Sequence, residues 1–280
     1  MKYIDFHIHT IYSDGIDSPK TIVRAAKFIG LDAITISDHD TMAGYKEALE
    51  ESKRWDLLVL PNTEISTIKY HILGLNVNPE YIPFQNFLEH CKKTQEKVCN
   101  QRVEVLKNNG MPLTLAKIKQ EFPKSRLGKG NLVSTMLIDP DCRDYIKTDL
   151  GDTNFKKVFD FYVGKEGLAG NVEKVYFISE EEAISQIHLA GGLAILAHPF
   201  KDVQDFKEID RLISFGLDGL EIQPNYGDKN IPFEQYAKEK GLLTSYGSDY
   251  HGAYKKNRPL LGREKNVLNK DLENYLNCII

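Results

Sequence analysis

Short apolar runs alternate with amphipathic stretches in the first and last parts of this 280-residue chain. Apolar runs of this length, bounded by turn residues, are typical of buried β-strands. The stretches between them carry apolar residues at helical spacing, as Ile22, Val23 and Ala26 do. The alternation of strand and helix predicts an α/β protein with parallel strands. The predicted strands cover residues 3–9, 31–36, 57–60, 70–75, 193–197, 217–222 and 242–246.

Residues typical of helix ends support the helices between these strands. Ser18 and Pro19 form a pair typical of an N-cap and the first helical position, and Gly30 closes the helix that follows. Ser179 with Glu182 three residues later is a capping-box pattern, which predicts another helix start. The other helices predicted in these two parts cover residues 42–53, 206–215, 232–240 and 270–277.

The middle of the chain has a different rhythm, with helical patterns and no clear strand. A long charged helix is predicted over residues 87–109, and basic loops rich in Gly and Pro separate the helices after it. We therefore expect residues 1–75 and 176–280 to form a barrel. Residues 76–175 are expected to be a helical insertion over its open end. Its other predicted helices cover residues 113–122, 131–138 and 154–162.

Composition narrows the classes of function. A net charge of −4 gives no general attraction to nucleic acid or to anionic membranes, although a local basic pocket for phosphate remains open. No apolar run is long enough to span a bilayer, and no signal peptide is seen. The four cysteines lack metal or disulfide spacing, which favours a cytoplasmic protein with reduced thiols. We expect no membrane contact, no extended surface for duplex nucleic acid and no obligate protein partner.

The first predicted strand carries two histidines that point to one place. His7 and His9 are two residues apart, so their side chains share a face of the strand. Two imidazoles that converge in this way form half of a metal site. The turn that follows, Ser13-Asp14-Gly15, adds a carboxylate. The alternative is a pair of ordinary histidines near a strand end, and the rest of the chain decides between the two.

Most other histidines and several acids lie at or just beyond the end of a predicted strand. In a β/α barrel these ends meet at the face where active sites are built. Mixed imidazole and carboxylate ligands suit two or three divalent cations such as Mn, Fe or Zn, and such sites hydrolyse phosphate esters through a bridging hydroxide. His90 and His188 lie in predicted helices and are expected to be ordinary histidines. The candidate ligands are His7, His9, Asp14, His39, Glu64, His71, His198, Asp249 and His251.

The chain resembles the PHP (polymerase and histidinol phosphatase) superfamily of phosphoesterases. Order, spacing and strand context agree from the first strand to the last, so the resemblance covers nearly the whole chain. The motifs that carry it are His7-Ile8-His9 with Ser13-Asp14-Gly15, Ser37-Asp38-His39-Asp40-Thr41, Glu64-Ile65-Ser66, His71-Ile72-Leu73-Gly74, Ala197-His198-Pro199 and Gly247-Ser248-Asp249-Tyr250-His251-Gly252.

The resemblance implies a distorted (β/α)7 TIM-like barrel with a trinuclear metal centre. Glu64 would bridge two of the cations, and Asp38 or Asp40 would orient an imidazole without binding metal. The residues expected to carry catalysis are Glu64, His198 and Asp249 at the metals, together with Arg126. The three implied ligand sets are His7, His9, Glu64 and Asp249; Glu64, His71 and His198; and Asp14, His39 and His251.

The insertion resembles that of stand-alone PHP enzymes that hydrolyse nucleoside 3′,5′-bisphosphates, nucleoside monophosphates or short oligonucleotides. Those enzymes carry a basic segment similar to Arg-Pro-His, and the matching place here is Arg126-Leu127-Gly128-Lys129. Arg126 would clamp phosphate, and Lys129 would replace the lost contact. The alternative is that both are solvated loop cations.

A second departure from those enzymes follows Glu221. They often have Tyr-His there, whereas this chain has Gln223-Pro224-Asn225-Tyr226, so a histidine that could touch substrate is missing. Lys201, Arg258 and Arg263 are weaker candidates for the rim of the pocket.

The leading hypothesis is a metal-dependent phosphoesterase acting on phosphomonoesters of nucleotides or short 5′-phosphorylated oligonucleotides. One alternative is a phosphatase of the histidinol phosphatase type, which shares the barrel and the metals. The other is a catalytically silent PHP module that binds nucleotide, for which loss of ligands would be the sign.

Overall fold

The computed structural model describes residues 3–172, 177–252, 260–262 and 270–277. Arg258, Arg263 and Cys278 lie outside the described residues. The chain forms two compact units, of which the first combines residues 1–89 with residues 178–280. The second unit comprises residues 90–177.

A parallel three-stranded sheet in the order β1-β2-β3 begins the first unit. Ile4 pairs with Ala33, and Ile34 pairs with Val59. Strand β1 is shorter than the sequence predicts, because the apolar run of residues 3–9 continues beyond the regular pairing. The strand bounds are β1 Ile4–Asp5, β2 Ala33–Ile36 and β3 Leu58–Pro61.

A five-stranded sheet in the order β4-β5-β6-β7-β8 completes the first unit. The prediction of parallel strands throughout is wrong here, because β5 is antiparallel to both β4 and β6. Only residues 67–70 join β4 to β5, and a connection this short permits a hairpin but not a parallel crossover. The strand bounds are β4 Glu64–Ser66, β5 His71–Leu75, β6 Leu193–Leu196, β7 Gly219–Ile222 and β8 Leu243–Tyr246.

The reversal of β5 decides where His71 lies. His71 is the first residue of β5, and its carbonyl accepts a hydrogen bond from the Ala197 N–H at 3.0 Å. Because the two strands run in opposite directions, the start of β5 lies beside the end of β6. His71 and His198 therefore meet at the same end of the sheet. His71 precedes the apolar residues of its strand, whereas His198 follows those of its own strand.

The two sheets share a core and are bridged at two places. Ile8 pairs with Tyr250, and His39 pairs with Glu64, each as an isolated bridge. One cluster of buried apolar side chains draws on both sheets and on the last helix; it contains Ile4, Phe6, Ala33, Leu60, Leu73, Leu75, Ile195, Ala197, Leu272 and Leu276. These links establish a mixed α/β unit, and its closure as a distorted (β/α)7 barrel stays a prediction.

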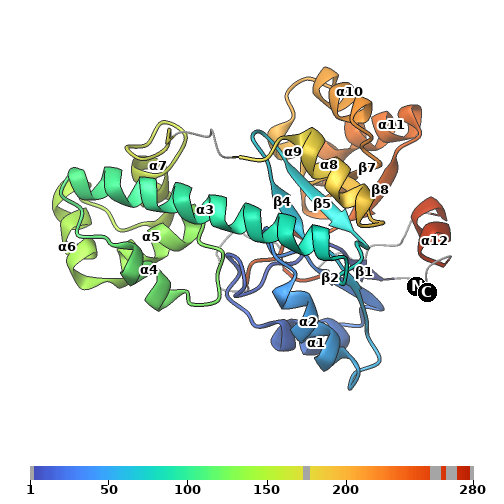
Figure 1. The fold of residues 1–280 in the computed structure, drawn as a ribbon, viewed down its shortest axis with the longest axis horizontal. Helices are drawn as coiled ribbons and strands as arrows, with labels where there is room; N and C mark the ends of the chain where they lie inside the picture. The colour runs from blue at the N-terminus through green and yellow to red at the C-terminus, as the bar shows by residue number, and fades with distance from the viewer. Residues whose placement is uncertain (1–2, 173–176, 253–259, 263–269, 278–280) are drawn as a thin grey trace. The chain divides into compact units, whose positions relative to one another are not determined.

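Two helices of the first unit, α1 and α8, begin where the capping residues predict. Ser18 Oγ accepts from the Thr21 N–H at 3.2 Å, and Ser179 Oγ accepts from the Glu182 N–H at 3.1 Å. Helix α8 packs on β5 and β6, as Figure 1 also shows. Two short elements, α9 and the 3-10 helix η1, were not predicted. The bounds are α1 Pro19–Phe28, α2 Ala43–Ser52, α8 Glu180–Leu189, α9 Pro199–Asp202, α10 Lys207–Ser214, η1 Pro224–Asn230, α11 Ile231–Lys240 and α12 Lys270–Asn277.

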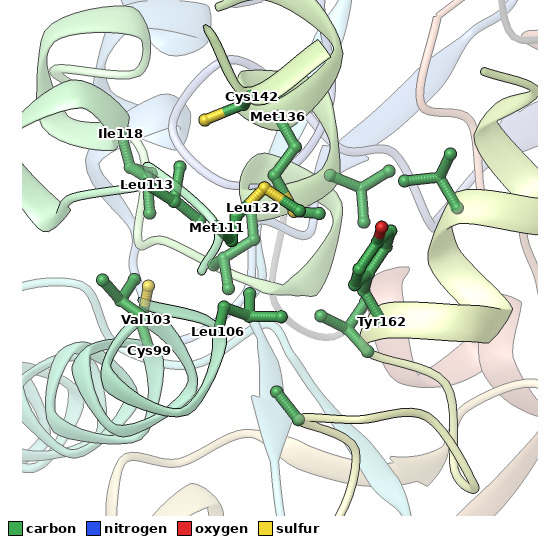
Figure 2. Close-up of a cluster of buried hydrophobic side chains, with 14 of the residues drawn as sticks. Cys99, Val103, Leu106, Met111, Leu113, Ile118, Leu132, Met136, Cys142 and Tyr162 are labelled. Atoms are coloured by element: carbon green, nitrogen blue, oxygen red, sulfur yellow. The ribbon is translucent and has the colours of Figure 1, made fainter. Parts of the chain in front are cut away.

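The second unit is helical and has a core of its own. Leu106, Met111, Leu132 and Tyr162 are among its buried side chains (Figure 2). Sequence analysis missed α6, which Asp139 caps by accepting from the Cys142 N–H at 3.0 Å. In the part of the chain that is described, no helix is both long and apolar enough to cross a membrane. The bounds are α3 Ile82–Asn108, which begins in the first unit, α4 Leu115–Glu121, α5 Lys129–Ile138, α6 Pro140–Asp149 and α7 Phe155–Tyr162.

Glu180 ties α8 to the β4–β5 hairpin. Its carboxylate accepts from the Lys69 N–H and from Thr67 Oγ1, both at 2.9 Å, and from Arg211 Nη2 at 3.2 Å. Burial alone would raise the pKa of Glu180, but these hydrogen bonds hold it below its usual range. Ionised Glu180 therefore stabilises the fold above about pH 4.3, and this contribution is lost as the pH falls through the lower pKa of the folded state.

We expect Glu180→Gln to lower the free energy of unfolding by about 1–2 kcal/mol at pH 7, because the substitution removes a buried, hydrogen-bonded charge. The difference from wild type should shrink towards zero below about pH 4. Urea unfolding at both pH values measures it, with the exposed neighbour Glu181→Gln as the matched control. A difference that does not change with pH would contradict this account of Glu180.

Candidate metal centre

His7 and His9 lie at the start of the site and are fully buried. Each follows β1 and points to the same side, and their Nε2 atoms are 2.9 Å apart. The Ile8–Tyr250 bridge fixes the backbone between them, and the His9 N–H donates to the Tyr250 carbonyl at 2.8 Å. The alternation predicted from the sequence therefore brings both ring nitrogens to one point.

Glu64 is the centre of the cluster. Its side chain is 1% exposed, and each of its oxygens lies near several imidazoles. Oε1 is 3.0 Å from both His71 Nδ1 and His198 Nε2. Oε2 lies 3.3 Å from His7 Nε2, 3.1 Å from His9 Nε2 and 3.2 Å from His39 Nδ1. One carboxylate thus touches five imidazoles, an arrangement that suits a ligand shared by two cations.

Two further carboxylates and one more imidazole complete the group. Asp249 Oδ1 is 3.5 Å from both His9 Nε2 and His251 Nδ1. Asp14 Oδ1 is 3.2 Å from His251 Nε2 and 3.9 Å from His39 Nε2. The structure therefore brings all nine candidate ligands into one cluster.

Three subsets of these residues place donor atoms within 4.8 Å of one another. One contains the implied set of Asp14, His39 and His251, with His9 added. A second subset has the implied ligands His7, His9 and Asp249 but lacks Glu64. A third has Glu64 and His71 as implied, with His39 in the place expected for His198. The subsets are His9, Asp14, His39 and His251; His7, His9 and Asp249; and His39, Glu64 and His71.

The charged groups of the cluster shift one another's pKa values. Burial would raise the pKa of Glu64, but the imidazoles of His39, His7 and His71 outweigh burial and hold it well below its usual range. Burial would lower the pKa of His9, but the carboxylates of Asp249 and Glu64 raise it to about 9. The carboxylates are therefore ionised beside protonated imidazoles. Divalent cations would displace those ring protons, and donor atoms limited to nitrogen and oxygen suit Mn, Fe or Zn.

Glu221, at the end of β7, was not predicted as a site residue. Its Oε1 is 2.7 Å from His7 Nδ1, and its Oε2 accepts from the His198 N–H at 2.7 Å. A Cβ at Gly247 would lie 2.5 Å from Glu221 Oε1, so glycine leaves room for this contact. Glu221 lies at a strand end like the proposed ligands, and that signal could have found it.

Asp38 acts on the cluster through Ser13. Its carboxylate accepts from the Thr10 N–H at 2.7 Å and from Ser13 Oγ at 2.6 Å, and Ser13 Oγ lies 3.2 Å from His9 Nδ1. Asp40 instead accepts from the Ser66 N–H at 2.9 Å. Of the two acids beside His39, Asp38 therefore has contacts that lead to an imidazole.

Two of the proposed ligands have a left-handed backbone. The φ angle is 32° at His198 and 55° at Asp249, values that residues other than glycine seldom adopt. The hydrogen bond from the His198 N–H to Glu221 helps to hold the first of them. Such conformations are costly and are found most often at functional sites.

Other histidines and basic residues lie in different surroundings. His188 Nε2 is 2.8 Å from Asp218 Oδ2, so His188 forms a hydrogen bond away from the cluster, and His90 is exposed on α3. Lys201, predicted only as a weak candidate, donates to Asp249 Oδ2 at 2.5 Å.

Arg126 and Lys129 belong to the second unit. Arg126 is 8% exposed, and Lys129 is the first residue of α5. Arg102, which sequence analysis missed, is 6% exposed, and its Nε has no hydrogen-bond partner among the residues described. Burial, together with the charge of Arg126, lowers the pKa of Arg102 to about 10. Two buried guanidinium groups therefore lie close enough to repel each other.

The mixed α/β fold and the buried cluster of imidazoles and carboxylates define a metal-dependent hydrolase. A model of the PHP domain matches residues 5–124. The chain is 30% identical over 260 residues to a 5′-3′ exoribonuclease of Haemophilus influenzae, with 89% of this chain and 90% of that protein covered. The chain therefore belongs to the PHP family of phosphoesterases.

Two further comparisons agree with this family. The chain is 26% identical over 263 residues to a 3′,5′-nucleoside bisphosphate phosphatase of Chromobacterium violaceum, with 90% of this chain and 88% of that protein covered. The solved structure of a candidate metal-dependent phosphoesterase from Bifidobacterium adolescentis has a TM-score of 0.77 at 25% identity, with 98% and 95% of the two chains covered.

Proposed function

We propose that this protein hydrolyses phosphate esters of nucleotides: a nucleoside 3′,5′-bisphosphate, a nucleoside monophosphate or a short 5′-phosphorylated oligonucleotide. The observation that carries the proposal is the cluster of nine donor residues, with Glu64 at its centre. Two relatives, named as an exoribonuclease and a nucleoside bisphosphate phosphatase, support a nucleotide substrate. A phosphatase of the histidinol phosphatase type is the alternative within the family, and a silent nucleotide-binding module would be expected to have lost ligands.

The residues present fit two or three divalent cations. Glu64 would be shared between two of them, since its two oxygens face different imidazoles. When bound, the cations supply Lewis-acid activation of water and neutralise charge on the phosphate. Glu221 orients His7, and Asp38 orients His9 through Ser13, so both imidazoles present Nε2 to the site. The proposed residues of the reaction are Glu64, His198, Asp249 and Arg126.

Arg126 and Lys129 are proposed to hold the phosphate of the substrate. The support is the burial of Arg126 near a second buried arginine, Arg102, since two such cations favour a bound anion. We also propose that the helical insertion supplies contacts to the substrate. A closed (β/α)7 barrel is proposed to hold the metal centre.

The test is hydrolysis by the purified protein supplied with Mn²⁺, Fe²⁺ or Zn²⁺. Phosphate release is expected from a nucleoside 3′,5′-bisphosphate or a short 5′-phosphorylated RNA, in preference to histidinol phosphate in the same assay. His7→Ala is expected to abolish it. Equal inactivity of wild type and His7→Ala across all these substrates and metals would contradict the proposal.

For Arg126→Met we expect KM for the nucleotide substrate to rise about tenfold, because a bidentate contact to phosphate is lost, while the bound metal stays unchanged. Steady-state kinetics and metal analysis of the same preparations measure both. Arg143→Met, an exposed arginine of α6 in the same unit, is the matched control. An unchanged KM would remove Arg126 from the substrate site.

A further inference from the structure

A group of cationic and aromatic side chains lies beside the metal centre, after the ends of β6 and β7. Lys201 of α9 donates to Asp249 Oδ2 at 2.5 Å, and its Nζ lies 5.9 Å from the ring centroid of Tyr226 in η1. Helix α9 begins directly after His198. The group is therefore connected to the proposed metal ligands through both the chain and the Lys201–Asp249 ion pair.

Two aromatic rings form the middle of this group. The ring centroids of Phe200 and Tyr226 are 4.9 Å apart, with a tilt of 44°. Both residues are partly exposed, so the pair is not part of the apolar core. Lys229 Nζ lies 5.2 Å from the centroid of Phe200, and Lys229 itself is exposed. Accessible rings beside movable cations are the elements with which proteins bind unpaired nucleotides.

Gln223 adds a polar group that still needs a partner. It is 2% exposed, and neither Nε2 nor Oε1 has a hydrogen-bond partner among the residues that the structure describes. The backbone at Gln223 is extended, so its side chain shares a face with Glu221, which contacts His7. An amide left unpaired on this side is costly, and a ligand that can accept and donate hydrogen bonds would satisfy it.

We propose that Phe200, Lys201, Gln223 and Tyr226 form a nucleoside-binding subsite beside the metal centre. The base stacks on the Phe200–Tyr226 pair, Lys201 contacts the phosphate, and the Gln223 amide hydrogen-bonds the sugar or the base. This subsite rests on the proposed function and deepens it, because it makes the nucleoside, and not the phosphate alone, the feature that is recognised.

Binding of two non-hydrolysable phosphonates to the metal-loaded protein tests the subsite. One is a nucleoside 5′-phosphonate in which a methylene group replaces the ester oxygen, and the other is the matching ribose phosphonate without a base. Isothermal titration calorimetry gives both dissociation constants. We expect wild type to bind the nucleoside compound about tenfold or more tightly than the ribose compound, because only the nucleoside has a base to stack.

The double variant Phe200→Leu with Tyr226→Leu is expected to bring that ratio close to one, with the affinity for ribose phosphonate kept within about twofold. If the double variant fails to fold, Tyr226→Leu alone is the second test. It should lower the ratio of the two dissociation constants about threefold or more. Phe206→Leu with Tyr236→Leu is the matched control, since these rings also form a pair, at 4.5 Å.

Three results would overturn the subsite: a ratio near one in wild type, a ratio that survives both variants, or an equal fall in the control. Failure of the proposed function is a different result, in which neither phosphonate binds and no phosphate ester is hydrolysed.

Discussion

Replacing Glu64 by glutamine is expected to lower kcat/KM for the nucleotide substrate by about 10³-fold or more and to reduce the metal bound per chain. Glutamine keeps the size of the side chain but removes the charge that five imidazoles surround. Cation chemistry contributes several kcal/mol to reactions of this kind, and each 1.36 kcal/mol is a factor of ten in rate.

Two measurements on the same Glu64→Gln preparation separate loss of metal from loss of fold. Elemental analysis counts the metal, and circular dichroism during heating reports the fold. Glu50→Gln, an exposed acid on α2, is the matched control and should behave as wild type. Full metal content together with wild-type activity in Glu64→Gln would show that Glu64 is not the shared ligand.

Glu221→Gln is expected to weaken metal binding by about 10- to 100-fold. Glu221 holds two of the proposed metal ligands in place, through His7 Nδ1 and the His198 N–H. A carboxylate behind a metal-binding imidazole fixes its tautomer and raises its basicity, and its loss has effects of this size.

Competition with a chromophoric chelator measures the metal affinity of Glu221→Gln, and thermal unfolding of the metal-free protein is followed in parallel. A residue with a purely structural role would change the unfolding temperature and leave the metal affinity as in wild type. Glu234→Gln, an exposed acid on α11, serves as the control. Unchanged metal affinity in Glu221→Gln would contradict the positioning role.

The sequence indicated much of the site because the relevant signals are local. His7 and His9 alternate along one extended segment, and the other proposed ligands follow or begin short apolar strands. The structure gathers these residues, and their roles as ligands stay a prediction. Capping residues such as Ser18 and Ser179 likewise marked helix starts that the structure contains.

What the sequence did not reveal depends on contacts between distant segments. The reversal of β5 follows from a hairpin at residues 67–70, which an apolar pattern alone does not distinguish from a longer connection. Glu221 lies at a strand end like the proposed ligands, but its contact with His7, which joins the last third of the chain to the segment after β1, is not visible in the sequence. The Phe200–Tyr226 pair and the burial of Arg102 have no sequence signature at all.

The most direct test of the central claim is the number of divalent cations in the wild-type protein after gentle purification. Elemental analysis against protein concentration gives that number without any choice of substrate. The nine donor residues centred on Glu64 predict about two or three cations per chain, of Mn, Fe or Zn. A value near zero that stays near zero after incubation with each of these metals would contradict the metal centre.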